Sequence, residues 1–121
     1  MHCAEPDITG IDMYMGIGGA PEGGLAAAAL KCMGGQIYGR LIFRNEDEKA
    51  RAIKAGITNF DRIYTKDEMV TQDVIFAATG VTGGSLLPAI KREVGFITTE
   101  TMLMRSKTGS IRRMIYRNPT K

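Results

Sequence analysis

The sequence predicts an α/β domain in which a layered mixed sheet is flanked by helices. Apolar runs with strand character alternate with helix-forming runs in the first part of the chain, and two strand-like segments around a glycine turn close it. The length of 121 residues fits one domain, and a hydrophobic share of 44% with 24% charged residues allows a packed core. No long uninterrupted apolar run occurs, so we expect no membrane-spanning segment.

The first elements are a strand, a glycine loop and a helix. Residues 11–17, IDMYMGI, are predicted to form a strand that enters the loop. A helix over residues 22–33 follows, because Pro21 suits the first helical turn and the glycines at 34 and 35 suit a helix end. Residues 36–43, QIYGRLIF, are predicted to be the next strand.

The middle of the chain carries two helix-start signals. Residues 44–56 predict a helix, in which Asn45 is the N-cap and acidic residues precede basic ones, as the helix dipole favours. A short strand then leads to a capping box of Thr65 with Glu68. The apolar run at residues 73–80, DVIFAATG, predicts a buried strand.

The end of the chain predicts a β-hairpin. FITTETMLMRS and SIRRMIY flank KTG, and Gly109 can supply the positive φ that the turn needs. Before the hairpin, VTGGS is predicted to be a loop, and residues 85–95 stay ambiguous because Pro88 interrupts any regular element.

Positive charge is concentrated in the last third of the chain. Residues 86–121 hold eight Lys/Arg and two acids, a balance of +6, whereas residues 1–85 hold eight Lys/Arg and eleven acids, a balance of −3. Such a basic end is either a solvated β-face or a surface that attracts nucleic acid or phosphorylated ligands. Because the sequence has neither an aromatic RNA-binding signature nor a zipper beside a basic helix, we predict no nucleic-acid partner.

Two cysteines and one histidine limit the possible chemistry. Cys3 and Cys32 form no Cys-x-x-Cys motif, and the first residues have no basic stretch followed by an apolar one, so we expect a reduced, cytoplasmic setting. His2 lies at the terminus, and without an internal histidine there is no Ser-His-Asp arrangement. Asp7 and Asp12 are expected to have surface or turn roles.

The glycine loop and the acid that follows it are the candidate site. The loop is either a tight turn or a phosphate cradle at a helix N-terminus, and it matches neither the dinucleotide fingerprint nor the P-loop. Glu22 is either a partner of the helix dipole or a metal ligand. A carboxylate beside a phosphate would repel it, and a divalent metal ion that bridges the two would remove the conflict.

Four segments, in order, resemble one enzyme family. They are GIDMYMGIGGAPEG, LAAAALKCMGGQIYGRLIFRNEDEKARA, VIFAATGVTGGSLL and TTETMLMRSKTGSIRR. With them the chain resembles the C-terminal part of class II fructose-1,6-bisphosphatase, the GlpX type, from about Asp7 to Arg113. The segments GIGGAPEG, ATGVT and TTET are the most specific to that family.

The resemblance implies a fold, a reaction and a site. The fold would be similar to the second domain of the lithium-sensitive sugar phosphatases. The family removes the 1-phosphate of fructose 1,6-bisphosphate in gluconeogenesis with Mn²⁺ or Mg²⁺ and a water nucleophile, and some members also act on sedoheptulose 1,7-bisphosphate. In the family the glutamate of GGAPEG is a metal ligand, here Glu22, and its second glycine contacts the substrate, here Gly19.

The sequence departs from the family pattern in two ways. Gly24 stands where a branched apolar residue is usual, which weakens the first helical turn by about 1 kcal/mol. Residues 1–121 correspond to the C-terminal domain, and the N-terminal metal-binding domain is absent. We therefore expect the chain alone not to turn over substrate, and no catalytic residue is assigned. The alternatives are a module that binds a phosphorylated ligand and one half of a split enzyme; homo-oligomerisation or pairing with the missing half would complete the assembly.

Overall fold

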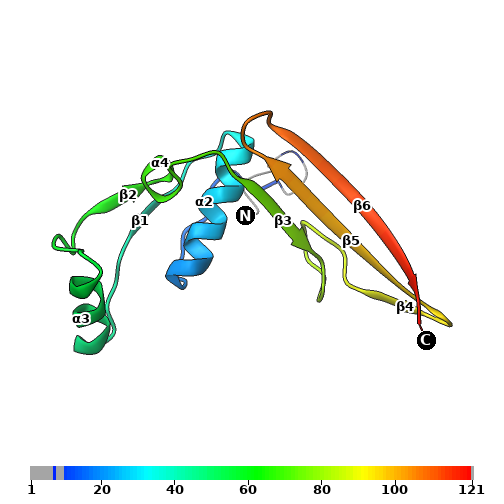
Figure 1. Cartoon of the computed structure of the whole chain (residues 1–121), viewed down its shortest axis with the longest axis horizontal. Coiled ribbons are helices and arrows are strands. Elements are labelled where there is room, and N and C mark those ends of the chain that lie inside the picture. Colours follow the sequence, from blue (N-terminus) through cyan, green and yellow to red (C-terminus); the bar gives the residue numbers. More distant parts are fainter. Residues whose placement is uncertain (1–6, 8–9, 121) are drawn as a thin grey trace.

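A computed structural model describes residue 7 and residues 10–120, which form helices and two antiparallel sheets along an elongated molecule (Figure 1). The elements, in chain order, are α2 (Ala20–Met33), β1 (Tyr38–Arg40), α3 (Glu46–Lys54), β2 (Ile63–Thr65), α4 (Lys66–Met69), β3 (Ile75–Thr79), β4 (Lys91–Glu93), β5 (Phe96–Arg105) and β6 (Ser110–Pro119). Figure 1 shows α3 at one end, α2 in the middle and the β5–β6 hairpin at the other end. None of the described helices is long and apolar enough to cross a membrane.

Helix α2 confirms the prediction made from the glycine and proline signals. It begins at Ala20, two residues earlier than predicted, with the extended backbone of Gly19 as its N-cap and Pro21 in its first turn. It ends at Gly34, which has a φ of 78° and donates its N–H to the Leu30 carbonyl. A left-handed glycine at this position satisfies carbonyls that the last turn leaves open.

The N-caps of α3 and α4 are also confirmed. The Asn45 side chain accepts a hydrogen bond of 2.9 Å from the Glu48 N–H, and the acidic first turn of α3 follows directly. At α4, the Glu68 carboxylate accepts a hydrogen bond of 2.8 Å from the Thr65 N–H. These ends were predictable because each depends on residues within one helical turn.

The strands lie in two antiparallel sheets rather than in one mixed sheet. The short strands β1 and β2 pair with each other, and β5 pairs with β3 and β4 on one side and with β6 on the other. Every pairing within the described part of the chain is antiparallel. The alternation of elements suggested parallel neighbours, but β3 and β4 do not pair with each other and both run antiparallel to β5. The chain reverses direction between β4 and β5 and again between β5 and β6, and no described helix lies in either connection.

The β5–β6 hairpin confirms the predicted turn at Gly109. This glycine has a φ of 65°, and its N–H donates to the Arg105 carbonyl at 2.9 Å. Ten residue pairs follow, from Arg105 opposite Ser110 to Phe96 opposite Pro119. The predicted loop at VTGGS, residues 81–85, is confirmed. Residues 85–95, left ambiguous by the sequence, continue this loop, place Leu87 in the core and then form β4.

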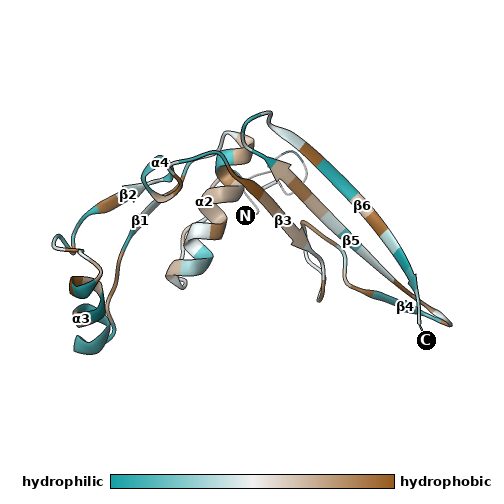
Figure 2. Ribbon diagram, viewed as in Figure 1, coloured by the Kyte–Doolittle hydropathy of each residue, from teal (hydrophilic) through white to brown (hydrophobic). Residues whose placement is uncertain are grey.

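Helix α2 covers one face of the larger sheet and forms the core with it. The buried residues of this core come from α2, β3, β5 and the loop before β4: Ala29, Leu30, Cys32, Phe76, Leu87, Met102 and Met104. Figure 2 shows polar and apolar bands along β6, and the register with β5 places arginine and apolar side chains on both faces of this strand. The prediction that β3 is a buried strand is correct for one face only. Phe76 lies in the core, whereas Ile75 on the other face is 65% exposed.

The predicted strand over residues 11–17 is wrong for the described chain. This segment has no strand assignment, and its side chains at Met13, Tyr14, Met15 and Ile17 are 75–86% exposed. A strand needs a neighbour to satisfy its backbone groups, and no described strand pairs with this segment. The predicted strand over residues 36–43 is likewise reduced to β1, because its partner β2 has only three residues.

Candidate metal and phosphate site

The candidate site lies at the N-terminal end of α2, where the exposed glycine segment runs into the helix. Gly19 is the N-cap, and its carbonyl accepts the Gly23 N–H at 3.0 Å as the first helical hydrogen bond. The N–H groups of Ala20 and Glu22 precede that bond and have no partner within the helix. Both predicted residues, Gly19 and Glu22, are therefore placed together at a helix N-terminus that can receive negative charge.

The Glu22 side chain folds back over Gly19. A Cβ placed on Gly19 would overlap the Oε2 atom of Glu22 and lie 3.1 Å from its Cδ. Glu22 is exposed, and no other described residue makes an ion pair or hydrogen bond with its carboxylate. The absence of a side chain at Gly19 thus provides the space that this carboxylate occupies.

The described residues provide an incomplete set of ligands for a metal ion. No group of three or more His, Cys, Asp or Glu side chains that could hold a metal ion occurs within residues 10–120 and residue 7. Mg²⁺ and similar hard cations often take one or two protein carboxylates and complete their shell with water and phosphate oxygens. Glu22 fits the role of one such carboxylate, and further protein ligands would have to come from elsewhere.

The other titratable residues singled out in the sequence do not add to this site. Asp7 and Asp12 are exposed, as predicted for surface positions. His2 and Cys3 lie outside the described residues. Cys32 is buried in the core, and burial raises the pKa of its thiol, which leaves it a poor metal ligand.

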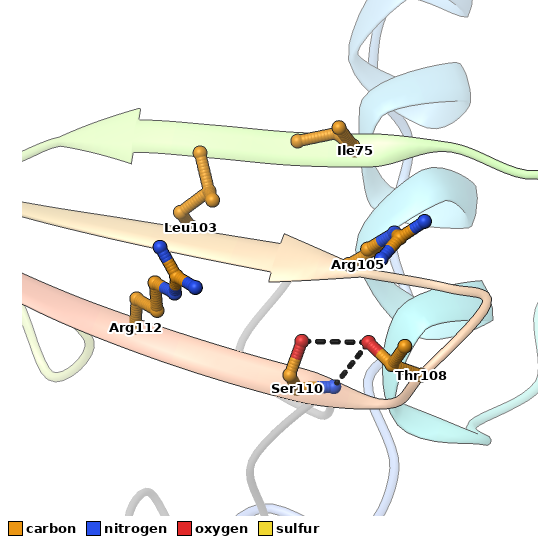
Figure 3. Close-up of a pocket in the computed structure, with 6 residues that line it drawn as sticks. All are labelled: Ile75, Leu103, Arg105, Thr108, Ser110 and Arg112. Atoms are coloured by element: carbon orange, nitrogen blue, oxygen red, sulfur yellow. Dashed lines mark hydrogen bonds between the residues drawn. The ribbon is translucent and has the colours of Figure 1, made fainter.

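Sequence reasoning missed a second group of polar residues on the larger sheet. Figure 3 shows two arginines and two hydroxyl side chains around a shallow depression of about 460 Å³, with α2 behind the sheet. Its lining residues are Ile75, Leu103, Arg105, Thr108, Ser110 and Arg112. The segment SIRRMIY was predicted as a strand, in which successive side chains point to opposite faces of the sheet. Only the register with β5 shows which of its two arginines lies on which face.

The described chain is thus an α/β protein in which one helix covers the larger sheet and carries Gly19 and Glu22 at its N-terminal end. The chain belongs to the family described as bacterial fructose-1,6-bisphosphatase, glpX-encoded, whose family model matches residues 1–118. It is 37% identical to the fructose-1,6-bisphosphatase class 2 of Haemophilus influenzae over an alignment of 125 positions, which covers 93% of this chain and 37% of that relative.

Relatives from cyanobacteria show the same pattern of coverage. The chain is 38% identical over 117 positions to proteins named D-fructose 1,6-bisphosphatase class 2/sedoheptulose 1,7-bisphosphatase from two strains of Synechococcus. These alignments cover 86% of this chain and 34% of each relative. The chain therefore spans about a third of the length of the curated relatives that it matches.

Proposed function

We propose that this chain is the C-terminal domain of a metal-dependent sugar-bisphosphatase that hydrolyses the 1-phosphate of fructose 1,6-bisphosphate. The observation that carries the proposal is the free Glu22 carboxylate at the N-terminus of α2, directly over Gly19. Family membership supports the reaction, and the names of the relatives support fructose 1,6-bisphosphate and sedoheptulose 1,7-bisphosphate as substrates. A cytoplasmic location, as for other enzymes of gluconeogenesis, belongs to the same proposal.

Glu22 would hold the metal ion, and the helix end would receive the phosphate. The unpaired N–H groups of the first turn and the helix dipole favour a phosphate oxygen, whereas the Glu22 carboxylate disfavours it. A bound Mn²⁺ or Mg²⁺ would neutralise that repulsion, polarise the phosphoryl group and lower the pKa of a bound water. Gly19 would contact the substrate, because it lets the backbone approach the ligand without an intervening side chain.

The chain by itself would bind but not turn over substrate. Metal-assisted phosphate hydrolysis needs a positioned water and several ligands, and the described part of the chain provides Glu22 but no group of three or more possible ligands. We propose that the remaining two thirds of the enzyme carry the other ligands. On its own the chain would then act as a module that binds metal and sugar phosphate weakly, or as one half of a split enzyme.

Mn²⁺ titration of the chain tests the role of Glu22. We expect weak binding that Glu22→Gln lowers at least tenfold, because the substitution removes the charge and keeps the shape. The matched control is Glu46→Gln, which removes an exposed acid from the first turn of α3 and should leave the affinity unchanged. Equal affinity of wild type and Glu22→Gln would refute the proposed ligand.

Phosphate release from fructose 1,6-bisphosphate in the presence of Mn²⁺ tests the proposed incompleteness. We expect no release from the chain alone. Release by the wild type that Glu22→Gln abolishes would mean that the short chain assembles a working site by itself, and it would overturn the proposal that other ligands are missing.

A further inference from the structure

The larger sheet has one covered face and one open face. Residues paired across antiparallel strands point to the same side of the sheet. The register therefore assigns each side chain of β3, β4, β5 and β6 to one face or the other. Phe76, Met102 and Met104 belong to the face under α2. The opposite side, here called the open face, carries Ile75, Ala77, Thr79, Arg92, Ile97, Thr99, Thr101, Leu103, Arg105, Ser110, Arg112, Met114, Tyr116 and Asn118.

The open face exposes apolar side chains that no described element covers. Ile75 is 65% exposed and Tyr116 is 53% exposed, and Leu103 lies half-buried between them along the sheet. Figure 3 shows Ile75 on β3 and Leu103 on β5, with Arg105 farther along β5 and Arg112 beside Leu103 on β6. Leu103 lies on the central strand β5, whereas Ile75 and Tyr116 lie on the outer strands β3 and β6, so apolar side chains occur across the width of this face. Exposed apolar area that extends across a sheet is typical of a surface that another layer covers.

Charge is divided unequally between the two faces. On the covered face, two of the three basic residues have acidic neighbours: Lys91 Nζ lies 3.2 Å from Glu93 Oε1, and an Arg113 nitrogen lies 3.9 Å from Glu100 Oε1. The third, Arg117, lies over the Phe96 ring. The open face carries three arginines and no acidic residue. Its arginines, which have no ion pair with any described residue, are Arg92, Arg105 and Arg112.

We propose that the open face is the docking surface for a segment from the remaining two thirds of the phosphatase, with an apolar side and acidic residues at its edges. This inference rests on the proposed function, which makes the chain one part of a longer enzyme. The matched relatives are about three times as long as the match, so most of such an enzyme lies outside this chain. The apolar side chains of this face would provide the packing, and the arginines would select acidic partners.

A second copy of the chain fits this surface poorly. A two-fold contact places the same patch on both sides of the interface. The arginines of both copies would then face each other, with no acid on either patch to compensate. Like charges held together in an interface cost several kcal/mol, by order of magnitude, so the open face disfavours self-association.

Thiol labelling of a chimera tests the proposal. In the chimera, residues 1–118 of this chain replace the matched segment of the Haemophilus influenzae relative. Ala77→Cys places a thiol on the open face, and Ala50→Cys places one on exposed α3 as the matched control, both in a Cys3→Ser background. Mass spectrometry of peptides reports each site separately.

We expect the thiol at position 77 to react at least tenfold more slowly in the chimera than in the isolated chain, and the thiol at position 50 to react equally in both. Adding Arg105→Glu and Arg112→Glu should restore fast labelling at position 77. Equal rates at position 77 in a chimera with native circular dichroism would overturn the proposal. Protection that survives charge reversal would overturn the acidic character of the partner.

Two further readouts separate this inference from its alternatives. In the isolated chain, labelling at position 77 should be independent of protein concentration, and a fall at high concentration would show that a second copy covers the face. Phosphate release by the chimera reports the proposed function separately. Protection without phosphatase activity would refute the proposed function and support the docking surface. Activity without protection would refute the docking surface and support the proposed function.

Discussion

The Glu22 carboxylate occupies the space that a side chain at Gly19 would need. A Cβ on Gly19 would overlap Glu22 Oε2, whereas one on the neighbouring Gly18 would meet no atom within 4 Å. The φ of Gly19 is −66°, which any residue can adopt. The glycine is therefore required by the position of the acid and not by the backbone.

Gly19→Ala should weaken metal binding more than folding. The overlapping atom is the end of a flexible side chain, so the carboxylate can move away, and alanine in place of a glycine N-cap should change stability by less than about 1 kcal/mol. We expect Mn²⁺ affinity to fall at least fivefold in a titration, while urea unfolding stays near wild type. Gly18→Ala is the control and should leave the affinity unchanged. A Gly19→Ala protein with wild-type affinity would contradict the proposed arrangement.

Two glycines in α2 should respond to alanine in opposite directions. Gly34 has a φ of 78°, so Gly34→Ala should lower the free energy of unfolding by about 1–2 kcal/mol. Gly24 lies inside the helix, and an added Cβ would meet nothing within 4 Å. Gly24→Ala should therefore raise the free energy of unfolding by about 0.5–1 kcal/mol. Urea denaturation of both variants checks the pair, and a shift of the same sign in both would contradict the assigned helix end.

Features that depend on near neighbours in the sequence were predictable. The N-cap at Asn45, the helix end at Gly34 and the turn at Gly109 each need only a few adjacent residues. The placement of Glu22 in the first turn of α2 followed from the same reasoning. The roles of Glu22 as a metal ligand and of Gly19 as a substrate contact were implied only by family resemblance. The structure adds that the Glu22 carboxylate lies against Gly19.

Features that depend on distant partners were not predictable. Residues 11–17 have the composition of a strand, but a strand requires another strand beside it, and the described residues provide none. Arg112 and Arg113 are adjacent in the sequence, yet one lies on the open face and the other on the covered face. Only the register of β5 with β6 separates them. The antiparallel sheets could not be deduced for the same reason.

Two glutamates should make stability depend on pH on the acid side. The hydrogen bond from the Arg44 N–H, followed by the Arg44 guanidinium, lowers the pKa of Glu48. The Thr65 N–H and the Arg62 guanidinium lower the pKa of Glu68 in the same way. A lowered folded-state pKa contributes stability that is present above the ordinary value of 4.5 and lost as pH falls through the folded-state value.

Glu48→Gln and Glu68→Gln should therefore be less stable than wild type at pH 7, and the difference should shrink as pH falls below 4.5. Urea denaturation across this range measures it. Glu46→Gln provides the control, since the Glu46 side chain makes no hydrogen bond or ion pair with another described residue. A difference that stays constant from pH 7 into acid would show that these carboxylates act through packing and not through charge.

Cys32 should make stability depend on pH on the alkaline side. Its thiol lies in the core and donates a weak hydrogen bond to the Val74 carbonyl at 3.9 Å. Burial raises the pKa of this thiol above its ordinary value of 9.0, although a backbone hydrogen bond from Phe76 opposes the change. The unfolded chain then loses its thiol proton at a lower pH than the folded chain. The resulting stability is complete below pH 9.0 and is lost as pH rises through the folded-state value.

Cys32→Ala should therefore remove part of the alkaline loss of stability while lowering stability at neutral pH, because the smaller side chain leaves a cavity. Urea denaturation of wild type and variant at a series of pH values from 7 to above 9.0 measures both effects. The other ionisable groups are common to both proteins and cancel in the difference. Since a buried, protonated thiol reacts slowly, native Cys32 should also label far more slowly than after unfolding in urea. Parallel stability curves for the two proteins, or rapid labelling in the native state, would place Cys32 outside the core.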